Sequence, residues 1–188
     1  MNLRFDEAKA TQVAALVLKL RGGRMHYIKL IKILYLIDRE GLKRWGIPVT
    51  TDRYVSMDHG PVVSNIFNLI TDGDKPKPIW SRYISPILGD YEVELLQDAP
   101  APSTDRLSRA EESLIAEVYE EIGRKNRWDI IHNHMHKLPE WRPPDGSSIP
   151  IHIRQILEAL GEDRDEISAT LKELRSAIAV EETLAPVF

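Results

Sequence analysis

The stretch that decides the fold spans residues 24–63 and reads RMHYIKLIKILYLIDREGLKRWGIPVTTDRYVSMDHGPVV. Apolar residues recur at intervals of three and four, which predicts an amphipathic helix from about His26 to Trp45. Additional isoleucine, leucine and tyrosine residues widen the apolar stripe almost around this helix. A helix of that kind is normally covered by neighbours on several sides, so we expect it at the centre of the fold.

The same helix also contains five basic residues, which are Lys29, Lys32, Arg39, Lys43 and Arg44. The simpler interpretation is a solvated face, on which long aliphatic stems cover apolar surface while the charges stay in water. The alternative interpretation is a docking surface for an acidic partner. The helix ends at the Gly-Ile-Pro sequence that follows.

The second half of the stretch predicts one strand and one further helix. Residues 53–57 have the composition of a short strand in which Tyr54 and Ser56 face the same side. Gly60-Pro61 is expected to open a third helix, because proline is favoured at the first helical position.

The remaining sequence predicts mostly helices. The first helix is expected to begin after Asp6 and to end at Gly22-Gly23, in an RGGR sequence that we interpret as a helix stop. Residues 83–88 and 91–96 are expected to form a β-hairpin across Gly89-Asp90. Residues 98–106 are interpreted as a linker between elements. Four more helices are predicted over about 108–122, 128–137, 151–160 and 163–179.

Sequence signals mark the ends of several of these helices. Ser108 with Glu111 and Asp163 with Glu166 have the spacing of capping boxes. We therefore predict a mainly helical α+β fold, a bundle of about six helices with a small antiparallel hairpin or sheet. Residues 1–188 are expected to form one domain, with a loose C-terminal tail from about residue 180.

Composition restricts the possible functions. The chain has 188 residues, a net charge of −4 at pH 7 and no cysteine, which excludes disulfides, thiolate metal sites and cysteine nucleophiles. The acidic balance is unusual for a nucleic-acid-binding domain, so a DNA-binding regulator is disfavoured. Neither a signal peptide nor a membrane span is evident, and a cytoplasmic protein is expected.

The histidines His132, His134 and His136 are the first candidates for a catalytic or metal site. On a helix His132 and His136 share a face, and an HxxxH pair can bind zinc. The glutamate that such zinc hydrolases carry beside the first histidine is replaced by Asn133. A structural role is therefore favoured, and a metal-dependent hydrolase is retained only as an alternative.

Other catalytic signals are weak. The Asp58-His59 pair lacks a nucleophile in a recognisable turn such as GxSxG. Neither a dinucleotide-binding nor a P-loop glycine motif occurs, so no cofactor is predicted. The tryptophans Trp80, Trp128 and Trp141 are expected to anchor the core, although the same residue type is frequent in partner-binding hot spots.

Several of these residues together resemble a known family. The helix sequence KLIKILY at 29–35 and the later DRY at 52–54 and HGPV at 59–62 resemble the Panacea domain of SocA-like antitoxins, which are phage- and bacteria-associated proteins. A second, weaker signature of that family resembles the region from Trp128 to Trp141. The signature residues expected to have structural roles are Lys29, Lys32, Tyr35, Asp38, Tyr54, Gly60, Pro61, Trp128, His136 and Trp141.

The resemblance implies a protein that neutralises a toxin by direct contact, the toxin commonly being encoded next to it. Some members of the family look like adaptors that deliver the toxin to a Clp-type protease. No catalytic residue comes with the resemblance, so a protein without enzymatic activity is expected.

Two alternatives to an antitoxin stay open besides the DNA-binding regulator. One is a phage or mobile-element protein that binds another host protein, and the other is the histidine-based hydrolase. For the contact surface we predict Lys43 and Arg44 on the long helix and Trp80 in the loop after the third helix.

Overall fold

The computed structural model describes residues 3–73, 76–96 and 103–184, and the side chains of residues 181–184 lie outside that description. The described residues form seven α-helices and five short strands, which confirms the predicted mainly helical α+β class. The α-helices are α1 (Glu7–Arg21), α2 (Tyr27–Trp45), α3 (Ser64–Thr71), α4 (Arg109–Ile122), α5 (Arg127–Asp129), α6 (Ile153–Leu160) and α7 (Arg164–Leu184). The strands are β1 (Arg24–His26), β2 (Tyr54–Met57), β3 (Gly60–Val63), β4 (Glu92–Glu94) and β5 (Ile149–Ile151). No helix in the described part is both long and apolar enough to cross a lipid bilayer.

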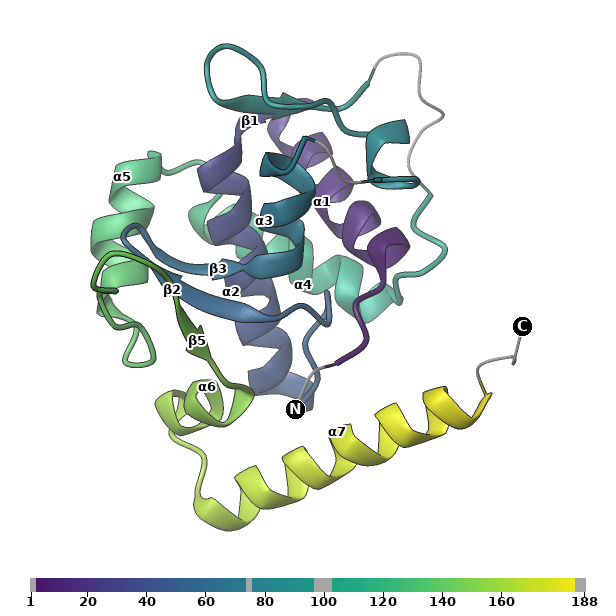
Figure 1. The fold of residues 1–188 in the computed structure, drawn as a ribbon, viewed down its shortest axis with the longest axis vertical. Helices are drawn as coiled ribbons and strands as arrows, with labels where there is room; N and C mark the ends of the chain where they lie inside the picture. The colour runs from purple at the N-terminus through teal and green to yellow at the C-terminus, as the bar shows by residue number, and fades with distance from the viewer. Residues whose placement is uncertain (1–2, 74–75, 97–102, 185–188) are drawn as a thin grey trace.

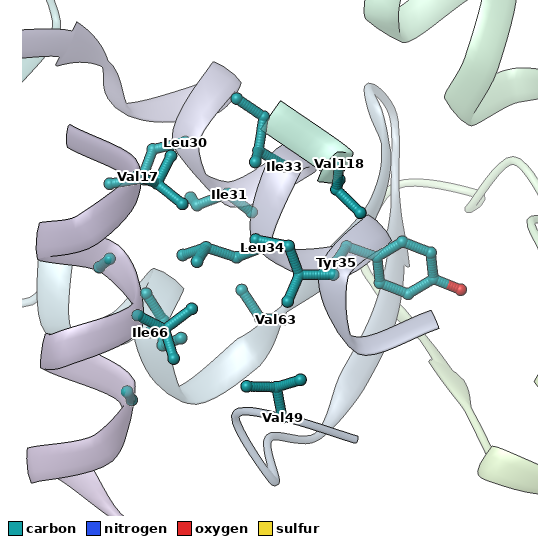
Figure 2. Close-up of a cluster of buried hydrophobic side chains, with 14 of the residues drawn as sticks. Val17, Leu30, Ile31, Ile33, Leu34, Tyr35, Val49, Val63, Ile66 and Val118 are labelled. Carbon is teal, nitrogen blue, oxygen red and sulfur yellow. The ribbon is translucent and has the colours of Figure 1, made fainter. Parts of the chain in front are cut away.

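Helix α2 is the centre of the molecule, as its sequence predicts. It contacts α1, α4, α6, β1 and β3 (Figure 1). Figure 2 shows its Leu30, Ile33 and Leu34 side chains among Val17 from α1 and Val118 from α4. Because neighbours surround it, apolar residues on nearly every face of α2 are buried.

This central position also explains an error in the sequence interpretation. The basic residues Lys29 and Lys32 were expected in water, but they are only 7% and 1% exposed. Arg39 is half-buried, and of these five basic residues only Lys43 and Arg44 at the end of α2 are exposed. A helix covered on several sides has no long solvated face for its first two lysines.

The strands form two small antiparallel sheets. In one sheet β1 pairs with β4, so that Met25 lies opposite Val93. In the other the order is β3-β2-β5, with Tyr54 between Val63 and Ile151. As predicted, Tyr54 and Ser56 are the buried residues of β2.

Two strand predictions need correction. The expected hairpin over residues 83–96 is reduced to a single bridge between Ile84 and Leu95 and a few backbone hydrogen bonds, because β4 pairs with β1. Gly60-Pro61 does not begin a helix but starts β3, and α3 begins at Ser64. The donors at the start of α3 are capped from outside by Asp52, whose carboxylate accepts from the amides of Asn65 (2.8 Å) and Ile66 (2.9 Å).

Most helix ends follow their sequence signals. Gly22, Gly46 and Gly161 adopt the left-handed conformation after α1, α2 and α6. The Ser108–Glu111 capping box is present at α4, and Asp163 and Glu166 exchange backbone and side-chain hydrogen bonds before α7. These local signals are reliable because each acts within one turn of the chain.

The predicted helix over 128–137 exists, but it changes form along its length. α5 continues into the π-helix η2 (Ile130–His134) and then into the 3₁₀ turn η3 (Met135–Lys137). Helix α7 extends beyond residue 180, where a loose tail was expected, and residues 185–188 of that tail lie outside the described part. Most of the predicted linker, residues 98–102, lies outside it as well.

Candidate functional site: a row of aromatic rings held by a buried polar network

Lys32 connects α2 to the turn between β2 and β3. Its ammonium donates to the backbone carbonyls of Gly60 and Pro61, both at 2.8 Å. Burial lowers the pKa of Lys32 to about 7. The aliphatic stem fills the interior while two carbonyl oxygens satisfy the charged end, so this lysine holds the hairpin on the helix.

Asp38 connects α2 to the segment that leads into β2. Its fully buried carboxyl accepts hydrogen bonds from the Thr50 amide (2.7 Å), the Thr50 hydroxyl and the Tyr54 hydroxyl (2.9 Å). Burial raises the pKa of Asp38 to about 7, although these hydrogen bonds act in the opposite direction.

Glu140 connects α2 to the segment after η3. Its Oε1 accepts from the Tyr35 hydroxyl (2.9 Å) and from Nε of Arg39 (2.8 Å). Its Oε2 is buried and has no hydrogen-bond partner among the described residues. Because Lys29 also donates to the carbonyl of Lys125 (2.7 Å), five polar residues of α2 reach four separate segments.

The segments held in this way carry a row of rings. We call the side chains of His59, Trp128, His132, His136 and Trp141 the ring row. Trp128 meets His59 edge to face with centroids 5.6 Å apart and stacks on His132 at 6.0 Å. His136 meets His132 at 5.4 Å and stacks on Trp141 at 4.2 Å.

Two hydrogen bonds fasten the ring row to the hairpin. Nε1 of Trp141 donates to the carbonyl of Met57 (3.0 Å), and Nε2 of His136 donates to the carbonyl of Asp58 (3.1 Å). Burial, followed by the charges of His132, Lys32 and His59, lowers the pKa of His136. Trp128, which lies between His59 and His132, is 44% exposed, so the row presents aromatic surface to solvent.

A small hollow adjoins the ring row. It has a volume of about 170 Å³ and is lined mainly by apolar side chains from α2, β3 and α3, with His59 at its edge and Lys32 also in its wall. An apolar cavity of ~150 Å³ is large enough for benzene, so this one can accept a single apolar side chain.

The ring row accounts for two of the three histidines that suggested a metal site, and the third, His134, lies 3.2 Å from Nζ of Lys125 through its Nε2. His132 and His136 share a face as predicted, but each stacks on a tryptophan. Among the described residues, no group of three or more histidine, aspartate and glutamate side chains is arranged to hold a metal ion. This geometry favours ring packing over zinc ligation.

The residues predicted to contact a partner are not members of the ring row. Lys43 and Arg44 are exposed but paired, Arg44 with Glu40 (2.9 Å) and Glu117 (2.7 Å) and Lys43 with Glu40 (3.9 Å). Trp80 is 2% exposed in the core, a position that argues against a surface role.

Comparison with known protein families identifies the family of the chain. The sequence pattern of the family described as "Antitoxin SocA-like, Panacea domain" matches residues 30–142, more than half of the chain. The chain belongs to this SocA-like Panacea family. Searches among curated proteins and solved structures gave no match.

The Panacea match covers the polar network and the ring row together. Lys32, Asp38, Glu140 and every ring of the row lie within it, while Lys29 lies one residue before it. The sequence did contain a signal for the row, since Trp128, His132 and His136 are spaced by four residues. Trp141 and His59 have no such spacing, and only the tertiary fold brings them to the row.

Proposed function

We propose that this Panacea protein is an antitoxin that neutralises a cognate toxin by direct protein–protein binding, without enzymatic activity, in the cytoplasm. Family membership over residues 30–142 is the observation that carries the proposal. The toxin is expected to be the product of a neighbouring reading frame.

The ring row is the contact surface that we favour. Tryptophan is enriched in binding hot spots, because a large rigid ring buries much surface at little entropic cost. Trp128 is exposed in the folded protein, and the adjoining hollow of about 170 Å³ can receive an apolar side chain of the partner. The polar network beneath supports this proposal because it fixes the rings before binding.

Co-expression with the neighbouring gene product tests the function. We expect growth that the toxin alone arrests to be rescued, and the two proteins to co-purify. No rescue together with no co-purification would refute the proposal. Capture of a different host protein by the purified chain would instead support the mobile-element alternative.

A matched pair of tryptophan substitutions tests the surface. Trp128→Ala is expected to weaken toxin binding by about thirtyfold or more, the range of a hot-spot residue. Trp45→Ala is the control, because Trp45 at the end of α2 is similarly exposed, at 40% against 44%. Binding by isothermal titration calorimetry that is equal in both variants would exclude the ring row as the contact.

The lifetime of the toxin distinguishes two modes of neutralisation. If the protein masks the toxin, the half-life of the bound toxin is unchanged in cells that lack Clp proteases. If it delivers the toxin to a Clp-type protease, the half-life lengthens in those cells.

A further inference from the structure

A cationic hollow lies at the start of α2. It has a volume of about 510 Å³, is open to solvent, and is lined by the end of α1, by β1, by the first turn of α2 and by residues 124–128. Six cationic side chains and one carboxylate, that of Glu92, line it. The cationic residues are Arg21, Arg24, Lys29, Arg124, Lys125 and Arg127.

Most of this charge lacks a counter-charge. Arg24 pairs with Glu92 and its acidic neighbours, and Arg124 pairs with Glu120 (3.3 Å). Arg21, Lys29, Lys125 and Arg127 have no ion pair with any carboxylate in the described part of the chain. In a protein with a net charge of −4, four unpaired cations in one hollow are a strong local contrast.

Lys29 gives the hollow a positive wall that is largely shielded from water. Its ammonium can donate three hydrogen bonds, but the carbonyl of Lys125 is its only acceptor among the described residues. Burial and then the charge of Arg21 lower the pKa of Lys29, and burial and then the charge of Arg127 lower the pKa of His26. The cations therefore lie close enough to destabilise one another, and a bound anion would relieve this repulsion.

The other basic end of α2 is different. Lys43 and Arg44 form ion pairs with Glu40 and Glu117, so they contribute little positive electrostatic potential to the surface. The cations at the end of α2 are thus compensated, whereas most of those in the hollow around its start are not.

The aromatic neighbour of the hollow indicates the kind of anion. Trp128 lines both the hollow and the ring row, with the Arg127 guanidinium 5.2 Å from its centroid and His132 stacked on it. Trp128 is also the exposed ring of the proposed protein contact, and the chain as a whole has a net charge of −4, which disfavours nucleic acid as the bound anion. Carboxylates on a protein segment match the unpaired arginines and lysines.

We propose that the cationic hollow binds a segment of the toxin that carries at least two closely spaced Asp or Glu residues, beside the contact with the ring row. This inference rests on the proposed antitoxin function. The residues of the hollow that lie between positions 21 and 29 precede the matched span of 30–142, so family membership alone does not account for the hollow.

A titration of the full-length chain tests the chemistry without the toxin. A hexaglutamate peptide is added while amide resonances are followed by NMR, and sodium tripolyphosphate is added in a parallel experiment. Hexaglutamate is expected to shift resonances of residues 21–29 and 124–128, with an affinity that falls as salt is raised. Absence of these shifts, or shifts with tripolyphosphate alone, would overturn the assignment to an acidic protein segment.

Two double charge reversals locate the site. Arg21→Glu/Arg127→Glu is expected to weaken hexaglutamate binding by about tenfold or more, whereas Lys43→Glu/Arg44→Glu, with the same change in net charge, weakens it less than about threefold. All four side chains lie at the surface or half-buried, and a thermal melt verifies that both variants fold. Equal losses in the two variants would mean general charge attraction and would overturn the hollow as the site.

The same variants separate this inference from the function on which it rests. If the neighbouring gene product binds the wild type and the Arg21→Glu/Arg127→Glu variant equally, the hollow is not the contact, and the antitoxin function stands. If it does not bind the wild type while hexaglutamate occupies the hollow, the proposed toxin partner is wrong and the acidic-segment site stands. Loss of toxin binding in this variant alone supports both.

Discussion

Asp38 and Lys32 lie on the same central helix and illustrate two ways of burying a charge. The lysine gives its hydrogen bonds to backbone carbonyls, and the aspartate receives its own from Thr50 and Tyr54. In both cases burial moves the pKa to about 7, so that the neutral form becomes accessible near neutral pH.

The raised pKa of Asp38 predicts a pH-dependent stability. The folded protein retains this proton up to about pH 7, whereas the unfolded chain releases it near the ordinary value of 3.8. The free energy of unfolding therefore falls as the pH rises from about 4 to about 7, by at most ~1.4 kcal/mol per pH unit for one proton, and this contribution is constant above pH 7.

Asp38→Asn is expected to flatten that fall, as measured by urea unfolding between pH 4 and pH 7. Asp52, whose pKa burial raises to about 6, still contributes in the variant, so the remaining decline ends near pH 6. The titration of Lys32 lies outside this range, between about 7 and 10.5. Equal slopes in the wild type and the variant would show that Asp38 stays ionised throughout.

Side-chain burial was the least predictable property at this scale. A lysine in a helix is normally solvated. No residue near Lys32 in sequence indicates that its ammonium will donate to the carbonyls of Gly60 and Pro61, which follow the end of the helix and another strand. Trp80 was predicted both as a core anchor and as part of the contact surface, and only the packing of distant segments, which buries it, decides for the core.

At the scale of elements, the β2–β3 hairpin depends on Gly60. Its φ of +96° lies in the left-handed region, and a Cβ at this position would be 2.5 Å from Cβ of Met135 in η3. Glycine thus permits both the turn and the close approach of the segment that carries the ring row.

Gly60→Ala is expected to destabilise the protein by more than the ~1–2 kcal/mol that the left-handed conformation alone costs a non-glycine residue. Gly146→Ala is the control, because Gly146 has a φ of +84° but no atom within 4 Å of the added Cβ. Urea unfolding of both variants separates backbone strain from the clash with Met135. Equal losses would mean that the contact with Met135 relaxes freely.

The predictability of an element depended on where its partners lie. Helices with caps and long apolar stripes, such as α2 and α4, were predicted nearly to the residue because their signals are local. The three-residue strands β1 and β5 were missed, since their hydrogen bonds are made with strands far away in sequence. The sequence of Gly60-Pro61 suits a helix start as well as a strand after a turn, and only pairing with β2 decides between them.

At the scale of the whole molecule, helix α7 either unfolds together with the rest of the chain or forms a separate cooperative unit. It lies at the end of the molecule opposite β1 and outside the matched Panacea span (Figure 1). Ile167, Leu171 and Leu174 bury its inner face, and α7 packs on α6. We propose that residues 1–188 unfold as a single domain.

Ile167→Ala is expected to lower the free energy of unfolding by about 2–4 kcal/mol, because it removes a buried side chain and leaves a cavity. Val180→Ala, at a position that is 57% exposed, should change it by less than ~0.5 kcal/mol. One calorimetric transition in both proteins and unaltered toxin neutralisation are the expected results. A separate, earlier transition in Ile167→Ala would assign α7 to a unit of its own.

The covering of α2 by elements from the second half of the chain has a consequence for synthesis on the ribosome. Helix α6, the last element that covers α2, begins at Ile153, which is more than half of the chain after α2 ends at Trp45. The rings of residues 128–141 also follow α2 at a long distance in sequence. At translation rates of roughly 5–20 residues per second, the apolar α2 stays incompletely covered for on the order of ten seconds. A nascent chain of this design exposes its central helix early and completes its proposed binding face late, so a toxin made in the same interval would meet no finished partner until translation is nearly over.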